Sequence, residues 1–390
     1  MQPAARTCAL RKSRAKPQIR YAARPCQNSE ACERRETRLR GEMKLAHPYK
    51  GQPQKAFWKQ AVAQHNPLDI SGWYSKKYEI GSAKIATAGS CFAQHIGANL
   101  RKNGYSYIDV EPCTWFLDEE DRPAFGYGIY SARYGNVYTT RQLLQLIRRA
   151  LGEFRPSERA WKHKSGFVDP FRPTIEPEPM DTEEEVFAAQ KAHLARVRDM
   201  FANVDVFVFT LGLTEAWISR EDGSAFPICP GVSGGEFDNS KYALVNLDYP
   251  STMADLENFV QILKHHRRDA KVLLTVSPVP LNATATQDHV AVATTYSKSV
   301  LRAVAGALCA KYDFIDYFPS FEIISSSPMR SMFFNPDMRT VSSSGVAHVM
   351  KQFFVEHPPS IGGTIKKPTA EAAQNVVCDE ELLRMAEAAQ

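Results

Sequence analysis

Four short apolar runs, each separated from the next by segments with helical spacing, most strongly constrain how this 390-residue chain can fold. The runs are KIATA (84–88), VDVFVFTLG (204–212), KVLLTVSP (271–278) and DFIDYFPS (313–320). Helices are predicted at 91–104, 139–151, 181–204, 251–267, 289–312 and 342–354. The alternating run YSYIDV (105–110) predicts one more strand. Strands that alternate with helices predict an α/β fold, a three-layer α/β/α sandwich around a mostly parallel sheet.

The charge of the chain is unevenly distributed along the sequence. Residues 1–42 carry a net charge of +7, which leaves −2 for the remainder. A body without excess positive charge argues against a nucleic-acid partner. We predict that 1–42 is a disordered basic extension with the natural start at Met43, that 43–357 form a single α/β domain, and that 358–390 are a loosely attached tail.

Several classes of protein lack support in the sequence. We find no apolar signal region and no stretch of about 18 apolar residues, which predicts a cytoplasmic protein without a membrane span. The eight cysteines contain no CxxC pair, so no metal site is expected. Neither GxxxxGK[ST] nor a GxGxxG after the first strand is present, and no cofactor is predicted.

Polar residues follow the predicted strands where those strands end. They are Gly89-Ser90-Cys91, Thr210 to Glu215, Ser277-Pro278 and Tyr317 to Ser320. The carboxyl ends of parallel strands meet at one edge of a sheet, which is where such folds bind ligands. A serine at this place either caps the next helix or acts as a nucleophile at the positive helix end. The G-x-S-x-G pattern is absent, and the residues alone leave both interpretations open.

Six ordered motifs carry a resemblance to a known family. They are GSCFA (89–93), YGNVYTTRQLLQL (134–146), TLGLTEAW (210–217), TVSPVPLNATAT (275–286), YSKSVLRAV (296–304) and YFPSFEI (317–323). From about Pro48 to Val355 the chain resembles the GSCFA family, which is similar to the SGNH (GDSL-type) hydrolases with their flavodoxin-like fold. The resemblance implies serine-dependent ester hydrolysis or acyl transfer on a small-molecule or carbohydrate ester. The alternative is a binding protein that has lost catalysis on the same scaffold.

The resemblance also implies roles for particular residues. Ser90 matches the nucleophile of the first SGNH block, with Cys91 as a rival that is expected to face the core. Gly128 or Gly135, with Asn136 beside the second, matches the block that supplies an oxyanion donor.

The third and last blocks depart from the SGNH pattern. The third reads Gly212-Leu213-Thr214-Glu215, so Thr214 replaces the asparagine that donates to the oxyanion. Glu215 is either a catalytic carboxylate or a structural partner. The last block supplies Asp337, but Thr340 stands where a histidine is expected. His289 and His348 are the candidate bases, and Glu215 or Asp337 would orient the base.

Overall fold

The computed structural model describes residues 47–113 and 117–359. The chain divides into two compact units, 1–57 and 58–390. The described part of the first unit contains a turn and the 3₁₀ helix η1 (Gln54–Ala56). All further elements belong to the second unit. The expected boundary at 42–43 and most of the expected tail lie outside the described residues.

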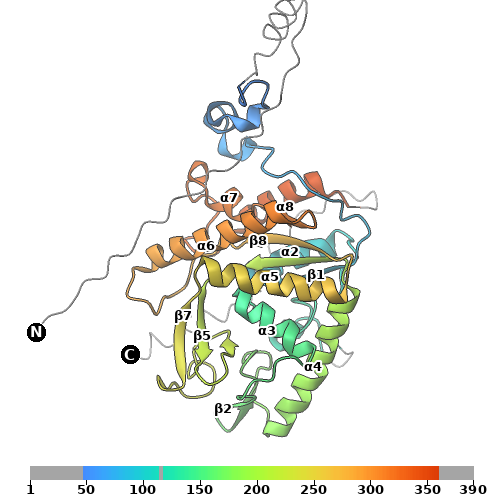
Figure 1. Ribbon diagram of the computed structural model, residues 1–390, viewed down its shortest axis with the longest axis vertical. Helices are drawn as coiled ribbons and strands as arrows, with labels where there is room; N and C mark the ends of the chain where they lie inside the picture. Colours follow the sequence, from blue (N-terminus) through green and yellow to red (C-terminus); the bar gives the residue numbers. More distant parts are fainter. Residues whose placement is uncertain (1–46, 114–116, 360–390) are drawn as a thin grey trace, which may run out of the picture. The chain divides into compact units, whose positions relative to one another are not determined.

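The core of the second unit is a four-stranded parallel sheet. Its strands are β1 (Ile85–Gly89), β4 (Val206–Leu211), β8 (Lys271–Val276) and β9 (Ile315–Tyr317), in that spatial order (Figure 1). Gly89 pairs with Thr210, and Leu211 pairs with Val276, so three strands end at one edge. The predicted parallel sheet is confirmed.

The strand expected at 105–110 is reduced to a single bridge between Ile85 and Tyr107. The amide of Thr87, which would continue the pairing, instead donates to the Ser131 hydroxyl at 2.9 Å. Val110 likewise donates its amide to the Ser131 carbonyl. A loop distant in sequence therefore takes the place of the ladder. The segment still lies beside β1 through this bridge. The other edge of β1 pairs with β4, so 105–110 and β4 lie on opposite sides of β1.

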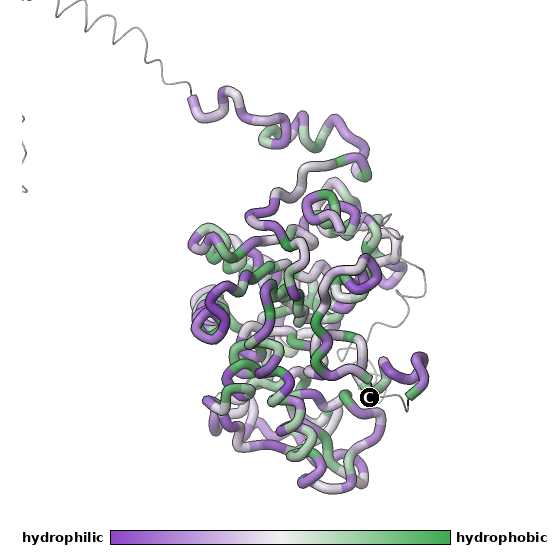
Figure 2. Tube along the Cα trace, turned by 90° about the vertical axis from the view of Figure 1, so that its right-hand side faces the viewer, coloured by the Kyte–Doolittle hydropathy of each residue, from purple (hydrophilic) through white to green (hydrophobic). Residues whose placement is uncertain are grey.

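Helices cover both faces of the sheet, which confirms the three-layer α/β/α architecture (Figures 1 and 2). Phe207 and Phe209 pack toward one layer, and Val206 and Val208 toward the other, as the alternation of a strand requires. The first layer contains α3 (Thr140–Ala150), α4 (Glu183–Asn203), α5 (Tyr249–His266) and α6 (Val290–Lys311). The second contains α2 (Cys91–Lys102), α7 (Ser320–Ser325) and α8 (Ser343–Glu356). In Figure 2 hydrophilic stretches prevail along the periphery.

Helix starts follow from local capping. Thr139 caps α3 through a reciprocal pair with Gln142, one of the two caps predicted there. The start of α4 differs from the prediction, because Thr182 rather than Asp181 accepts from the amide of Glu185 at 3.3 Å. The amide of Asp181 is bound by the Glu185 carboxylate instead.

Two small antiparallel sheets were not predicted. One is the hairpin β2 (Trp161–His163) with β3 (Gly166–Val168), and the other has the order β6 (Ala225–Phe226), β5 (Glu215–Ser219), β7 (Tyr242–Asn246). Short helical turns complete the elements at Lys59–Ala63 (π), Pro67–Asp69, Arg122–Phe125 and Ser327–Met329. Within the described ranges, we find no helix with the length and apolar character to cross a membrane.

Candidate functional site

Ser90 lies between the end of β1 and the first residue of α2. The preceding Gly89 has φ +144°, and a Cβ there would lie 2.5 Å from the carbonyl oxygen of Thr210. Only glycine fits this close approach of two strands. The amide of Ser90 donates to the same carbonyl at 3.3 Å, which fixes the turn but leaves that amide engaged.

The hydroxyl of Ser90 is enclosed and has no partner among the described residues. The residue is 4% exposed, and its Oγ forms no hydrogen bond within the described part of the chain. Although Ser90 occupies the N-cap position of α2, its side chain does not cap the helix. An unsatisfied buried polar group costs about 1–3 kcal/mol, so capping does not account for a serine here.

The Ser90 side chain borders a cavity of about 10 Å³, which is roughly the space of one water molecule. Cys91, Gly212, Ser277 and Lys298 also line it, and an apolar rim is formed by Leu213, Val279, Pro280 and Leu281. A Cβ on Gly212 would lie 3.0 Å from both Ser90 Cβ and the carbonyl oxygen of Tyr138. The glycine therefore lets the chain after β4 pass directly against the serine.

Lys298 is the charged residue of this cavity, and sequence reasoning did not single it out. It lies on α6, is 3% exposed, and donates from Nζ to the carbonyl of Gly212 at 2.6 Å. Its neighbour Ser297 accepts from the amide of Thr214 at 3.0 Å. A signal was present, because Lys298 stands three residues before Leu301 and seven before Ala305, within the buried stripe of α6.

Cys91 opens α2 and is 6% exposed. It was expected to face the core. The residue is buried, but it also lines the Ser90 cavity. Both candidate nucleophiles therefore border the same space.

The predicted oxyanion donors lie at different depths. Gly128 and Gly135 have φ of +67° and +68°, which suits turns, and neither lines the Ser90 cavity. Asn136 is buried, and its Oδ1 lies 2.5 Å from the Tyr130 hydroxyl, which is 3.3 Å from the carbonyl of Ser90. Of these three residues, Asn136 is thus the one linked to the serine by hydrogen bonds.

The residues after β4 are held by other elements. The Thr214 hydroxyl donates to Asn246 Oδ1 of β7 at 2.6 Å. Glu215 begins β5, and its carboxylate accepts from the Thr284 hydroxyl at 2.6 Å and the Ala285 amide at 3.3 Å. Glu215 therefore links the loop after β8 to the sheet β6-β5-β7.

Asp337 closes a local turn. Its Oδ1 accepts the amides of Arg339 and Thr340, each at 3.0 Å, and its Oδ2 accepts the Thr340 hydroxyl at 2.8 Å. The threonine that stands in place of the expected histidine is thus part of this turn.

The candidate histidines lie on other surfaces. His289 is exposed and caps α6, with Nδ1 accepting the amide of Ala291 at 3.2 Å. His348, on α8, stacks on Phe333 with ring centroids 4.9 Å apart. Burial, aided by Lys351, lowers the pKa of His348. No histidine is among the described residues that line the Ser90 cavity.

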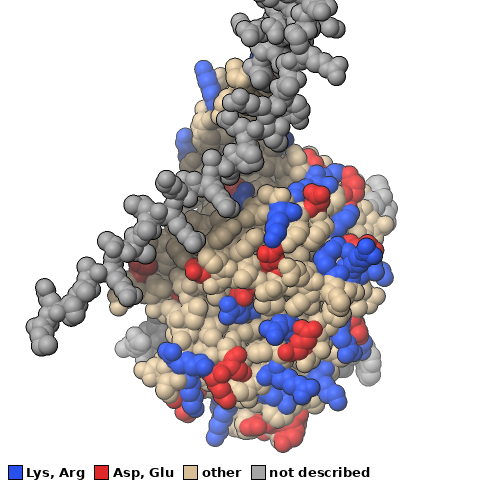
Figure 3. Space-filling view, in the orientation of Figure 1, with Lys and Arg blue, Asp and Glu red and all other residues tan. Residues whose placement is uncertain are grey.

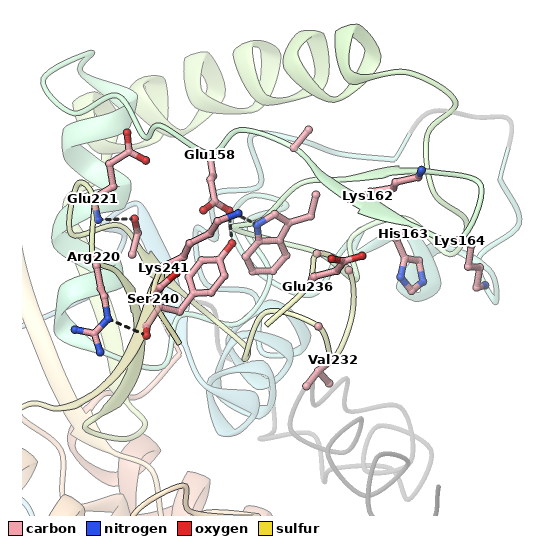
Figure 4. A pocket seen from close by; sticks show the side chains of 17 residues that line it. Glu158, Lys162, His163, Lys164, Arg220, Glu221, Val232, Glu236, Ser240 and Lys241 are labelled. Atoms are coloured by element: carbon pink, nitrogen blue, oxygen red, sulfur yellow. Dashed lines mark hydrogen bonds between the residues drawn. The ribbon is translucent and has the colours of Figure 1, made fainter. Parts of the chain in front are cut away.

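A much larger cavity, of about 1070 Å³, lies between the hairpin β2–β3 and the sheet β6-β5-β7 (Figure 4). It is lined by charges of both signs. The Glu158 carboxylate accepts from Trp161 Nε1 and from the Tyr242 hydroxyl, each at 2.7 Å, so these polar groups satisfy one another. In the described ranges no group of three His, Cys, Asp or Glu side chains is arranged to hold a metal ion.

The GSCFA family model matches residues 84–353, about two thirds of the chain. The chain belongs to the GSCFA family. The matched segment of this GSCFA protein begins one residue before β1 and ends within α8, so it includes the whole parallel sheet and every residue that lines the Ser90 cavity. No curated protein and no solved structure matches the chain.

Proposed function

We propose that this GSCFA protein is a serine-dependent ester hydrolase or acyltransferase with Ser90 as its nucleophile. The observation that carries the proposal is the buried Ser90 hydroxyl, which has no partner in the described residues and lies at a strand–helix turn beside Gly212 and Lys298. The position is the carboxyl edge of the parallel sheet, where α/β folds place their ligands.

The chemistry proposed is two-step acyl transfer. Ser90 Oγ attacks the acyl carbonyl carbon while its proton passes to a base, and the carbonyl oxygen becomes negative. The N-terminus of α2 stabilises that oxygen through its partial positive charge. The intermediate expels the alcohol, which takes up the proton. Water or an acceptor hydroxyl then attacks the acyl-serine carbonyl and gives its proton to the base. The bond to Oγ breaks, the acid or the new ester is released, and the base returns the proton to Ser90 Oγ.

The position of Lys298 supports it as the base. Lysine accepts a proton once it is neutral, and catalytic lysines of this kind are enclosed by protein. In the structure its Nζ is bound to the Gly212 carbonyl, so it must turn from that oxygen toward Ser90 Oγ. His289 and His348 do not line the cavity, and Glu215 and Asp337 are engaged in loop contacts. From the family resemblance, the substrate is expected to be a small-molecule or carbohydrate ester.

Labelling with a fluorophosphonate probe tests the nucleophile. We expect wild type and Cys91→Ala to be labelled and Ser90→Ala to remain unlabelled. Label on Ser90→Ala would remove Ser90 from this role, and its loss in Cys91→Ala alone would transfer the role to the cysteine. A folded wild type that never reacts would contradict the proposal and favour the binding protein.

Thermal unfolding of Ser90→Ala provides a second readout that does not depend on the probe. Because the hydroxyl makes no hydrogen bond to the part of the chain that the structure describes, the variant should be as stable as wild type or more stable. A structural N-cap would instead lose about 1 kcal/mol. A clear drop in the melting temperature would therefore support a structural serine.

A further inference from the structure

A second cavity, of about 720 Å³, lies at the opposite end of α3 from Ser90. It is bounded by the last turn of α3, the segment 151–159 and one side of α4. The eleven residues of α3 separate the two places by about 15 Å along the helix. The volume is within the range of sites that bind small molecules.

The charge of this lining has one sign. Among the described residues, no acidic side chain borders the cavity, and five cations do: Arg149, Arg155, Arg159, Lys191 and Arg198. Within the described residues, none of their side chains forms an ion pair or a hydrogen bond. Over α3 and α4, Figure 3 shows Lys and Arg interspersed with Asp and Glu, so the acid-free lining differs from the surface around it.

Arg149 is held by an aromatic ring and not by an ion pair with any described residue. Its guanidinium lies 3.6 Å from the ring centroid of Phe171. Burial lowers the pKa of Arg149 to about 10; Asp169 opposes this shift, and Arg172 and Arg159 add to it. Asp169, the nearby carboxylate, is already paired with Arg172 at 2.7 Å. The positive charge of Arg149 is therefore incompletely balanced.

A second guanidinium has the same kind of support. Arg159 lies 4.0 Å from the ring centroid of Phe187, which belongs to α4. Stacking on an aromatic face fixes the guanidinium plane and leaves its N–H edge available to an anion. Two arginines are thus oriented before any ligand arrives.

We propose that this cavity binds a small phosphorylated molecule that carries two or more negative charges. Guanidinium groups bind phosphate oxygens through paired charge-assisted hydrogen bonds, which match the arginine-rich lining. The apolar side chains of Leu151, Phe154 and Leu194 leave a wall for the organic part of such a ligand. The site is distinct from Ser90, and the proposal does not depend on ester chemistry.

Calorimetric titration of the full chain with inorganic pyrophosphate tests the site. We expect binding at low ionic strength that weakens as salt is added. Arg198→Gln and Arg155→Gln should each weaken the affinity by about tenfold. Arg196→Gln is the matched control, because it removes the same charge from α4 at an exposed position outside the cavity.

Two outcomes would overturn the proposal. One is a folded wild type that shows no binding of pyrophosphate. The other is an equal loss of affinity in Arg196→Gln and Arg198→Gln, which would mean general attraction to a basic surface. Fluorophosphonate labelling of Ser90 plays no part in this readout, so the two proposals fail separately.

Discussion

The two ends of α3 show how differently one helix can contribute to two sites. Just before its start, Tyr138 adjoins Gly212 and lines the Ser90 cavity of about 10 Å³. At its end, Arg149 borders an open cavity of about 720 Å³. The shape of the first site depends on the backbone, because Gly89 and Gly212 allow close approach of the chain at the strand–helix turn. The second is built from long charged side chains. The two proposals follow this difference: the enclosed end holds the proposed nucleophile Ser90, and the cation-rich end has the volume to bind a small molecule.

The largest expected effect is at the enclosed end. Lys298→Met should slow fluorophosphonate labelling of Ser90 by about a hundredfold, the range of a lost general base. Lys264→Met is the matched control, because Lys264 also donates to a backbone carbonyl, that of Ala270 at 3.1 Å. An unchanged labelling rate in Lys298→Met would leave Lys298 as only an anchor of the Gly212 loop.

The buried His193 of α4 should make the stability of the protein sensitive to acid. Burial lowers the pKa of His193 to about 4, and Arg172 adds to this, although its Nδ1 lies 2.7 Å from Glu111. Between pH 6.5 and 4 the unfolded chain binds this proton and the folded chain does not, so the free energy of unfolding falls as pH falls. By pH 5 the loss is about 1–2 kcal/mol for this group.

Urea unfolding at pH 7 and pH 5 measures this dependence. His193→Gln can retain the contact with Glu111 and should lose less stability on acidification than wild type. An identical pH dependence in the two proteins would show that His193 titrates normally in the folded state. His357, whose pKa burial lowers to about 4, leaves a residual dependence in both.

A smaller effect is expected at the N-cap of α3. Thr139→Ala removes the capping hydroxyl and should cost about 1 kcal/mol in urea unfolding, whereas Thr139→Ser should cost little. The carbonyl of the preceding Tyr138 accepts the amides of Gly212 and Leu213. Labelling of Ser90 should therefore change in Thr139→Ala while pyrophosphate affinity stays the same. The reverse pattern would contradict the division between the two ends.

The smallest effects are expected when a variant of one site is measured in the assay for the other site. Arg155→Gln should leave the labelling rate of Ser90 unchanged, and Lys298→Met should leave pyrophosphate affinity unchanged. A change of several-fold in either measurement would join the two ends into one coupled site.

The parallel sheet was predictable because its strands are buried on both faces, and runs such as VFVF have no other way to be covered. The strand predicted at 105–110 is only a single bridge, because the Ser131 hydroxyl accepts the amide of Thr87 that would have continued the pairing, and no local pattern reveals the position of Ser131. Ser90 could be found because strand and helix meet there in the sequence itself. The surroundings of Ser90 could not, since Lys298 lines the same cavity from α6, more than two hundred residues away in the chain.

If Ser90 acts as proposed, the size of its cavity requires that access be gated. A space for about one water cannot hold an acyl group, so an ester would first have to displace the lining residues Leu213, Val279, Pro280 and Leu281. The observed rate is then the chemical rate multiplied by the fraction of molecules in which the rim is open. Glu215, through its hold on Thr284 and Ala285, is placed to set that fraction without touching the substrate. Turnover would be governed by loop opening as much as by the reactivity of the serine.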